Sequence, residues 1–330
     1  MKYLLLFTTF SIFLIQCKNK PTTDASKIKK DATLAQLDSI IKTQPDNADA
    51  YYVRANYYLG KMQLGESTTD INKAIELDST IAKYYVTVAD LHLITNNSGR
   101  CKSALDKCLE VDSNNIEGLL KMSELYMYVK ENAKAIGYAN RVLNKEKTNA
   151  KAYFLIGMNQ KELKDTTRAL LAFQEAINNN QDYYNAYIQL GLLYGAKNNP
   201  KAILYYTNAS NIDAKNPEPY YNKGVFYQTQ GDLKKAVDAY NQALQLRADY
   251  KGALYNMGLA IIEIEKNYAK AATFFERNML AQPNFALGFY MHGVCQEKMG
   301  NKKQAASDFE KALQLEPENE TMQLALNRVK

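Results

Sequence analysis

Residues 217–250 read PEPYYNKGVFYQTQGDLKKAVDAYNQALQLRADY, and this stretch decides the fold because its pattern recurs along most of the 330-residue chain. A tyrosine-rich apolar segment comes first and ends at Gln230-Gly231-Asp232. A second segment follows, in which alanine and tyrosine return at helical spacing. Glycine directly after a periodic apolar run commonly ends a helix, so the stretch predicts two helices joined by a short turn.

The same unit occurs eight times, with lengths between 33 and 35 residues. The units begin at residues 48, 82, 116, 150, 184, 217, 251 and 286. Half a unit precedes them from Leu34, and an unpaired segment follows from Glu320. A fixed period of this length is typical of repeat proteins, in which no unit buries its apolar face alone and neighbouring units must stack.

Four positions of the unit keep their residue type from copy to copy. Position 4 carries a large side chain: Tyr51, Tyr85, Leu119, Tyr153, Tyr187, Tyr220, Leu254 and Phe289. Position 8 carries a small residue: Ala55, Ala89, Ser123, Gly157, Gly191, Gly224, Gly258 and Gly293. Position 20 is also small: Ser67, Cys101, Ala135, Ala169, Ala202, Ala236, Ala271 and Ala305. Position 24 is aromatic in the last five units: Phe173, Tyr206, Tyr240, Phe275 and Phe309.

This spacing resembles the tetratricopeptide repeat, and the match covers about residues 34–319. The resemblance implies an all-α, right-handed superhelical solenoid over residues 34–330, with about eight helix-turn-helix units, an N-terminal half-unit and a C-terminal capping helix from residue 320. The small residue at position 8 lets the two helices of a unit approach closely, and the rings at positions 4 and 24 fill the space between them. Position 7, usually apolar in this family, is charged at Arg54 and Lys223. We expect these two side chains to cover the packed face with their stems while their charged ends reach water.

The N-terminus has the anatomy of an export signal. Residues 1–17 read MKYLLLFTTFSIFLIQC, with Lys2 before an apolar run of thirteen residues from Tyr3 to Ile15. A membrane-spanning helix needs about 20 residues, whereas a run of this length fits the core of a secretory signal. We therefore predict a signal peptide over residues 1–16 and a polar, lysine-rich tether over residues 17–33.

Leu14-Ile15-Gln16-Cys17 resembles a bacterial lipobox, although Gln16 stands where that pattern usually has Gly, Ala or Ser. The resemblance implies that the peptide is cut before Cys17 and that this cysteine carries acyl chains such as palmitate, two or three of which anchor a protein stably. If the cell has two membranes, Lys18 implies outer-membrane sorting, because retention usually asks for Asp there. The expected location is the cell envelope, at the outer membrane facing the periplasm. The alternative is an ordinary signal peptide with a cysteine near its end.

The net charge of +6 is concentrated in the leader and tether. Residues 1–31 contain six lysines and two aspartates, whereas the rest of the chain has 35 basic and 33 acidic side chains. A nucleic-acid-binding protein concentrates positive charge on its folded face. The charge distribution therefore predicts that nucleic acid is not a partner.

Residues that could catalyse a reaction or hold a metal are sparse. The two histidines, His92 and His292, fall at packed positions of first helices. His292 and Cys295 have the spacing of two metal ligands, but a zinc site needs three or four. Cys101 and Cys108 occupy the small positions 20 and 27, and their separation of about 10 Å along a helix is too long for a disulfide. We expect no enzymatic activity, no cofactor, no bound metal and no small-molecule substrate.

In the tetratricopeptide family, positions 2, 5, 9, 12 and 13 line the concave side, and positions 5 and 9 lie one turn apart on one helix face. From the fourth unit on, these two positions are apolar: Phe154, Met158, Ile188, Leu192, Tyr221, Val225, Tyr255, Leu259, Tyr290 and Val294. Two interpretations stay open. These side chains pack against neighbouring first helices and expose little, or they form a continuous apolar stripe that binds a helix or extended segment of a partner protein.

The fold and the leader together predict a non-catalytic protein-interaction scaffold or adaptor, lipid-anchored at the bacterial cell envelope, with a partner segment held in the concave groove. The alternative is a recognition module for cell-wall glycan or another polymer, which would depend on the groove tyrosines. A catalytic subunit is the least supported reading, because no phosphate loop, nucleophile elbow or paired acid constellation is present in the sequence.

Overall fold

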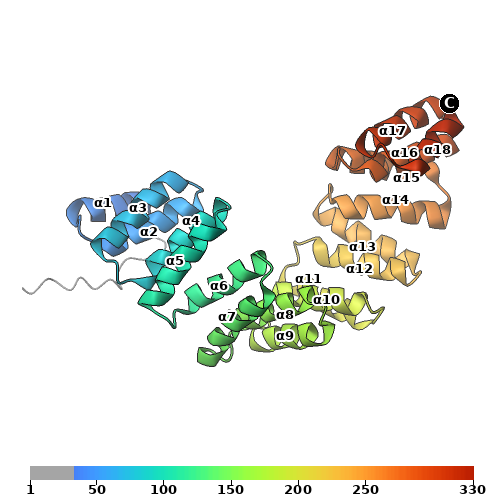
Figure 1. The fold of residues 1–330 in the computed structure, drawn as a ribbon. Helices are drawn as coiled ribbons and strands as arrows, with labels where there is room; N and C mark the ends of the chain where they lie inside the picture. The colour runs from blue at the N-terminus through green and yellow to red at the C-terminus, as the bar shows by residue number, and fades with distance from the viewer. Residues whose placement is uncertain (1–32) are drawn as a thin grey trace, which may run out of the picture. The chain divides into compact units, whose positions relative to one another are not determined.

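The structure is a computed structural model and describes residues 33–330. This part of the chain consists of helices α1 to α18 and contains no strand, so the predicted all-α fold class is confirmed (Figure 1). The chain forms two compact bodies, and the boundary between them lies between Gly118 and Leu119, inside α6 (Ile116–Tyr128). The N-terminal body contains α1 (Leu34–Thr43), α2 (Ala48–Gly60), α3 (Leu64–Leu77), α4 (Ala82–Ile94) and α5 (Ser98–Val111).

The C-terminal body takes up most of α6 and the twelve helices that follow it. These are α7 (Asn132–Lys145), α8 (Ala150–Glu162), α9 (Thr166–Asn179), α10 (Tyr184–Gly195), α11 (Lys201–Ile212), α12 (Glu218–Thr229), α13 (Leu233–Leu246), α14 (Lys251–Glu265), α15 (Tyr268–Ala281), α16 (Ala286–Lys298), α17 (Lys302–Leu315) and α18 (Glu320–Val329). The even-numbered helices from α2 to α16 are the first helices of the eight repeats, and the odd-numbered helices from α3 to α17 are the second helices. First helices begin at the first residue of their unit, except that α12 begins one residue later.

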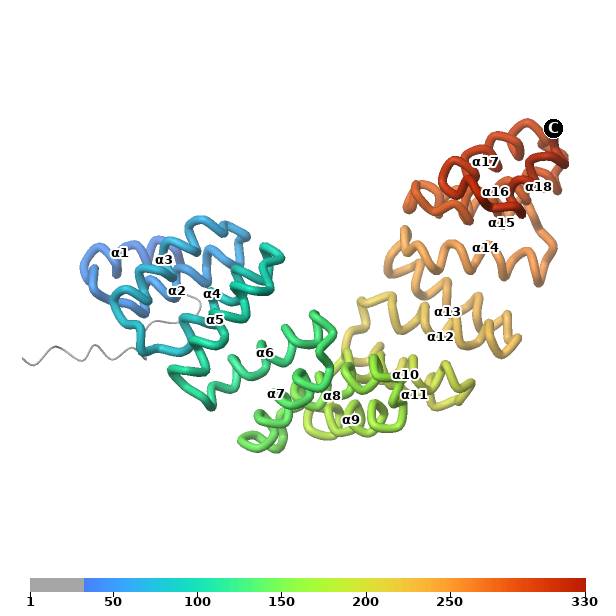
Figure 2. The backbone as a smooth tube through the Cα atoms, in the orientation of Figure 1, coloured from blue at the N-terminus to red at the C-terminus, as the bar shows by residue number. Residues whose placement is uncertain are grey.

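From α7 to α18, each helix packs against its neighbour in sequence, so that pairs stack on pairs (Figure 2). In addition, α10 contacts α12 and α12 contacts α14, whereas no pair of second helices between residues 119 and 330 makes a comparable contact. At α10, α12 and α14, the first helices of neighbouring repeats thus approach one another more closely than the second helices do. A stack with this asymmetry curves, and first helices line its inner side.

The packing inside a repeat depends on the small residue at position 8. In the last five units this residue is glycine, and it lies against the aromatic ring at position 24. A Cβ atom on Gly258, for example, would lie 2.6 Å from the ring of Phe275, closer than two carbon atoms can approach without displacement. The first three units have Ala55, Ala89 and Ser123 at position 8. At position 24 they have Ile71, Leu105 and Ala139, which are smaller than the aromatic residues of the last five units. Residue size at the two positions is therefore complementary along the chain.

The turn between the two helices of every repeat contains one residue with positive φ. Two of these are Gly231 (φ 76°) and Gly300 (φ 86°), which confirms the role predicted for glycine in those turns. The other six units use residues with a side chain, at φ between 53° and 63°: Met62, Asn96, Lys130, Lys164, Asn198 and Lys266. The left-handed conformation costs such residues about 1 kcal/mol each, so the turn geometry is imposed by the packing of the two helices.

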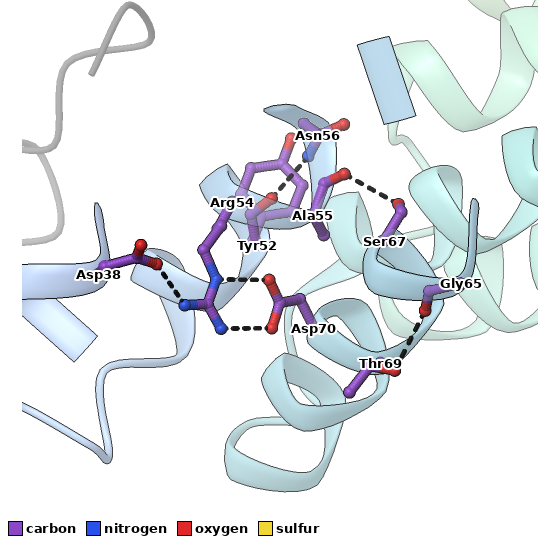
Figure 3. A network of polar contacts seen from close by, with 9 residues as sticks. All are labelled: Asp38, Tyr52, Arg54, Ala55, Asn56, Gly65, Ser67, Thr69 and Asp70. Atoms are coloured by element: carbon purple, nitrogen blue, oxygen red, sulfur yellow. Dashed lines mark hydrogen bonds and ion pairs between the residues drawn. The ribbon is translucent and has the colours of Figure 1, made fainter. Parts of the chain in front are cut away.

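A polar network links the helices of the N-terminal body (Figure 3). The guanidinium of Arg54 on α2 donates two hydrogen bonds to Asp70 on α3, with N–O distances of 2.6 and 2.8 Å, and a third of 2.7 Å to Asp38 on α1. The Arg54 side chain is 19% exposed, so its charged end is only partly accessible to water and is engaged by carboxylates. Its carboxylate partners hold it between helices, and hydrogen bonding to Asp70 raises the pKa of Arg54 above its usual value.

Candidate functional site

The ten residues predicted to line a groove lie on successive first helices of the C-terminal body, from α8 to α16. Eight of them are half-buried. Ile188 is only 4% exposed and belongs to the core formed with α9 and α11, so it offers almost no surface to a partner. Leu192, one turn further along α10, is 37% exposed. We call the ten predicted residues except Ile188 the apolar stripe, so that Leu192 is part of it.

Each aromatic ring of the stripe rests on other rings. Phe154 lies between Phe173 and Tyr183, with ring centroids 5.6 and 5.2 Å away. The same arrangement places Tyr221 against Tyr240 and Tyr250, Tyr255 against Phe275 and Phe285, and Tyr290 against Phe309. One side of each stripe ring is therefore packed while part of the ring stays exposed. Rings held in this way lose little conformational freedom when a partner binds.

The supporting rings include three residues that stand where a helix cap is expected. Tyr183, Tyr250 and Phe285 are the N-cap residues of α10, α14 and α16, and none of their side chains makes a capping hydrogen bond. By contrast, the side chain of Asn149 before α8 accepts a hydrogen bond of 2.9 Å from the backbone N–H of Ala152. A side-chain cap of this kind stabilises a helix by about 1 kcal/mol. Three first helices of this body lack it and carry at that position a ring that supports the stripe.

These three supporting rings were not predicted from the sequence. Their signal is an aromatic residue at the last position of a unit, which recurs at residues 183, 250 and 285. Gly252 was missed as well. A Cβ atom there would lie 2.7 Å from the ring of Tyr221, so only glycine lets that ring lie across the start of α14.

The stripe carries no Asp, Glu, Lys, Arg or His. Burial raises the pKa of Tyr221 and of Tyr255, which keeps both hydroxyls protonated well above neutral pH. At one end of the stripe, Lys161 on α8 donates a 2.7 Å hydrogen bond to the side-chain oxygen of Gln189 on α10. Burial lowers the pKa of Lys223, which lies on α12 over the ring of Tyr220. The stripe can therefore accommodate apolar side chains and hydrogen-bonding groups, but it has no paired charges to recognise an ion.

The corresponding face of the N-terminal body is polar. Asp49 on α2 accepts a hydrogen bond of 3.0 Å from the hydroxyl of Tyr84 and forms a 2.7 Å ion pair with Lys83, both on α4. The side chain of Asn56 accepts a hydrogen bond from Thr87. Positions 5 and 9 of the first two units are mixed rather than apolar, with Tyr52 and Asn56 in the first and Val86 and Asp90 in the second. The contacts of Asp49 with Tyr84 and Lys83, and of Asn56 with Thr87, form a polar network on this face in place of an apolar stripe.

Within the described part of the chain, His292 and the three cysteine side chains are buried in the packing. His292 is buried, and its two ring nitrogens lie 2.8 Å from Asp308 and 3.1 Å from Gln296. Cys101 and Cys108 are buried, as predicted for small core residues. Burial raises the pKa of Cys108 to about 11 and that of Cys295 to about 12, so both remain thiols at neutral pH. In residues 33–330, no three His, Cys, Asp or Glu side chains cluster in the way a metal site requires.

The candidate lipidation site, Cys17, and the predicted signal peptide lie outside the described residues. Among the helices of residues 33–330, none combines the length and the apolar character needed to cross a membrane.

Comparison with known proteins places the repeat pattern in a family. Models described as tetratricopeptide repeat match residues 82–115, 151–182, 217–250 and 288–319. Among solved structures, a tetratricopeptide repeat protein from Parabacteroides merdae superimposes with a TM-score of 0.54 at 15% sequence identity. The match covers 75% of this chain and 98% of that one, and at this identity it shows the fold alone.

Two curated proteins are similar over part of the chain. The photosystem I assembly protein Ycf3 of Acaryochloris marina is 29% identical over 102 residues, which are 30% of this chain and 61% of that protein. The protein CTR9 homolog of Arabidopsis thaliana is 28% identical over 127 residues, which are 38% of this chain and 12% of that protein. The chain therefore spans less than two thirds of either relative.

Proposed function

This chain belongs to the tetratricopeptide-repeat proteins, and on that basis we propose that it is a non-catalytic scaffold that holds a segment of a partner protein against the apolar stripe. The observation that carries the proposal is the support beneath the stripe. Three first helices have an aromatic N-cap in place of a hydrogen-bonding one, and each of these rings packs against a stripe ring. Tyr183 and Tyr250 also pack against the core, and all three rings hold the stripe rings in fixed positions, as a rigid binding surface requires.

The partner segment that fits this surface is apolar on the side that makes contact. The stripe is uncharged from Phe154 to Val294, and its tyrosines bring large rings with a hydroxyl at the edge. Such residues are frequent among those that contribute most to binding energy. An amphipathic helix or an extended segment with regularly spaced apolar side chains meets these requirements. The name of one relative, an assembly protein, agrees with a role in holding other proteins.

Charged substitutions in the stripe test this function. We expect Leu192→Glu and Leu259→Glu, alone or together, to abolish partner capture, because a carboxylate would be buried against apolar surface on binding. The helical circular dichroism signal should be unchanged, since Leu192 is exposed and Leu259 is only half-buried. The measurement is crosslinking in intact cells, followed by mass spectrometry of the captured proteins.

The matched control is Leu171→Glu. Leu171 is 64% exposed on the second helix α9, away from the stripe, and the change adds the same charge. Capture should be retained in this variant. If all three glutamate variants recover the same proteins as the natural chain, the stripe is not the binding surface.

We also propose that the scaffold is lipid-anchored through Cys17 at the bacterial cell envelope, at the outer membrane facing the periplasm. The support is the sequence of the leader: an apolar run that ends at Leu14-Ile15-Gln16-Cys17 and is followed by Lys18. In Cys17→Ala, fatty-acid labelling of the chain should disappear and the protein should leave the membrane fraction. Cys101→Ala is the control, because Cys101 is buried at a position where other units have alanine. Labelling that persists in Cys17→Ala would refute the anchor.

A further inference from the structure

A cleft opens on the outer side of the C-terminal body, between the second helices α9 and α11. It lies opposite the side that carries the apolar stripe, where neighbouring second helices separate. Its volume is about 530 Å³, within the range of sites that bind small molecules. Gln174, Ile177 and Asn178 of α9 form one wall, Asn208, Asn211 and Ile212 of α11 form the other, and Gln181, Asp182 and Tyr187 complete the lining.

The cleft is lined mainly by amide side chains. Five of its nine lining residues are Asn or Gln, one is acidic, and none is basic. Two of the amides are already ordered: Gln174 donates a 3.0 Å hydrogen bond to Asn178 and accepts one of 3.1 Å from the hydroxyl of Tyr205. An amide offers a donor and an acceptor side by side without charge. The lining thus presents several neutral donors and acceptors, while Tyr187 and Ile177 beneath them are almost fully buried in the core.

This composition differs from the same face of the N-terminal body. There, the outward positions corresponding to Asn178 and Asn211 are Glu76 on α3 and Glu110 on α5. Both glutamates form ion pairs three residues along the helix, with Lys73 at 2.9 Å and Lys107 at 3.0 Å. Paired charges are the usual solution for a solvated helix face. On α9 and α11 these positions carry amides. Asn144, Gln245 and Gln314 stand at the same position of other units, so it is the cleft between α9 and α11, and not the repeat position, that distinguishes Asn178 and Asn211.

We propose that this cleft binds a neutral sugar unit of an oligosaccharide. Sugar hydroxyls both donate and accept hydrogen bonds, which matches the amides, and the apolar face of a sugar ring can lie on Ile212, which is half-buried at the end of α11. The absence of basic residues from the lining disfavours phosphate, nucleotide and carboxylate ligands. An extended peptide could satisfy the amides but needs apolar pockets for its side chains, and the outer cleft is lined mainly by polar groups.

Binding of neutral trisaccharides to the purified full-length chain tests the proposal. The probes are cellotriose, maltotriose and tri-N-acetylchitotriose, with saturation-transfer NMR to detect binding and a titration to measure it. We expect at least one of them to bind with a dissociation constant on the order of 1 mM or tighter. In Asn178→Ala/Asn211→Ala, the affinity should fall about tenfold or more, because two hydrogen-bonding groups are lost.

The control is Asn241→Ala/Gln245→Ala on α13, which removes two amides from the outer face of a second helix outside the cleft. Its affinity should equal that of the natural chain. Both double variants should keep their thermal unfolding temperature, because all four substituted residues are exposed at helix surfaces. The proposal is overturned if none of the three sugars binds, or if the cleft variant binds as tightly as the control. It is equally overturned if a neutral Gly-Ser-Ala peptide binds at the cleft and the sugars do not. Loss of partner capture in the stripe variants would not affect this result.

Discussion

Gly258→Ala is expected to destabilise the C-terminal body by about 1 to 3 kcal/mol, although alanine is the better helix former. The new methyl carbon would lie 2.6 to 2.9 Å from three ring carbons of Phe275, which is fully buried. Either the ring must leave its rotamer or α14 and α15 must move apart, and both cost packing energy. Urea unfolding followed by circular dichroism measures the effect.

The sign of the same substitution should reverse in a Phe275→Leu background. Leucine at position 24 already lies opposite alanine at position 8 in the second unit, as Leu105 and Ala89. Phe275→Leu alone leaves a cavity and should cost about 1 to 3 kcal/mol. With that space available, Gly258→Ala should then stabilise by up to about 1 kcal/mol, the difference in helix propensity.

Gly137→Ala provides the control for propensity alone. Gly137 lies in the interior of α7, and a Cβ atom there would meet no other atom within 4 Å. The substitution should therefore stabilise the natural chain by up to about 1 kcal/mol. Equal effects of Gly258→Ala in the two backgrounds would show that positions 8 and 24 are not coupled.

The pairing of these two positions explains why so much of the fold is predictable from sequence. A repeat presents the same packing problem eight times, so the size of Gly258 and Phe275 can be compared with that of Ala89 and Leu105 within one chain. The helix starts and the turn glycines Gly231 and Gly300 follow from the same recurrence. A residue type that recurs at one position of the repeat makes the same contact in each unit, because each unit packs against an almost identical neighbour.

Features that occur in single units were harder to predict. The aromatic N-caps run against the usual preference for Asn, Asp, Ser or Thr at that position, so a local rule gives no reason to expect them. The partial exposure of the stripe also depends on how far Tyr183 or Tyr250 covers the neighbouring ring. Ile188 fits the apolar pattern as well as Leu192 does, yet one is buried and the other exposed. Sequence periodicity identifies the face of a helix but not how much of it remains uncovered.

Arg54 is the clearest example of a contact that local sequence does not reveal. Its partner Asp70 is sixteen residues away, and the same spacing joins His292 to Asp308. Both pairs link positions 7 and 23 of a unit, where most units have apolar or small residues. In two of the three units with a polar residue at position 7, position 23 carries an aspartate that pairs with it, whereas in the third unit Lys223 stands opposite Ala239.

Arg54→Met should destabilise the N-terminal body by about 3 to 5 kcal/mol. The substitution keeps an unbranched stem but removes both hydrogen bonds to Asp70, which is only 4% exposed and would be left as a buried carboxylate without its cation. Hydrogen exchange of α2 and α3 should accelerate, while the exchange of α14 and α15 should be unchanged, because the defect lies in the N-terminal body.

A second substitution, at Asp70, distinguishes the contribution of the ion pair from that of side-chain packing. Arg54→Met/Asp70→Leu should recover most of the stability, because apolar side chains can replace a buried ion pair at little net cost once neither charge is left alone. Lys73→Met is the control on the same helix: it breaks the exposed pair with Glu76 and should leave unfolding unchanged. If Arg54→Met behaves like Lys73→Met, the network of Arg54 with Asp38 and Asp70 does not hold these helices together. If the double variant is no more stable than Arg54→Met, the unpaired carboxylate of Asp70 is not the source of the lost stability, because removing it has then gained nothing.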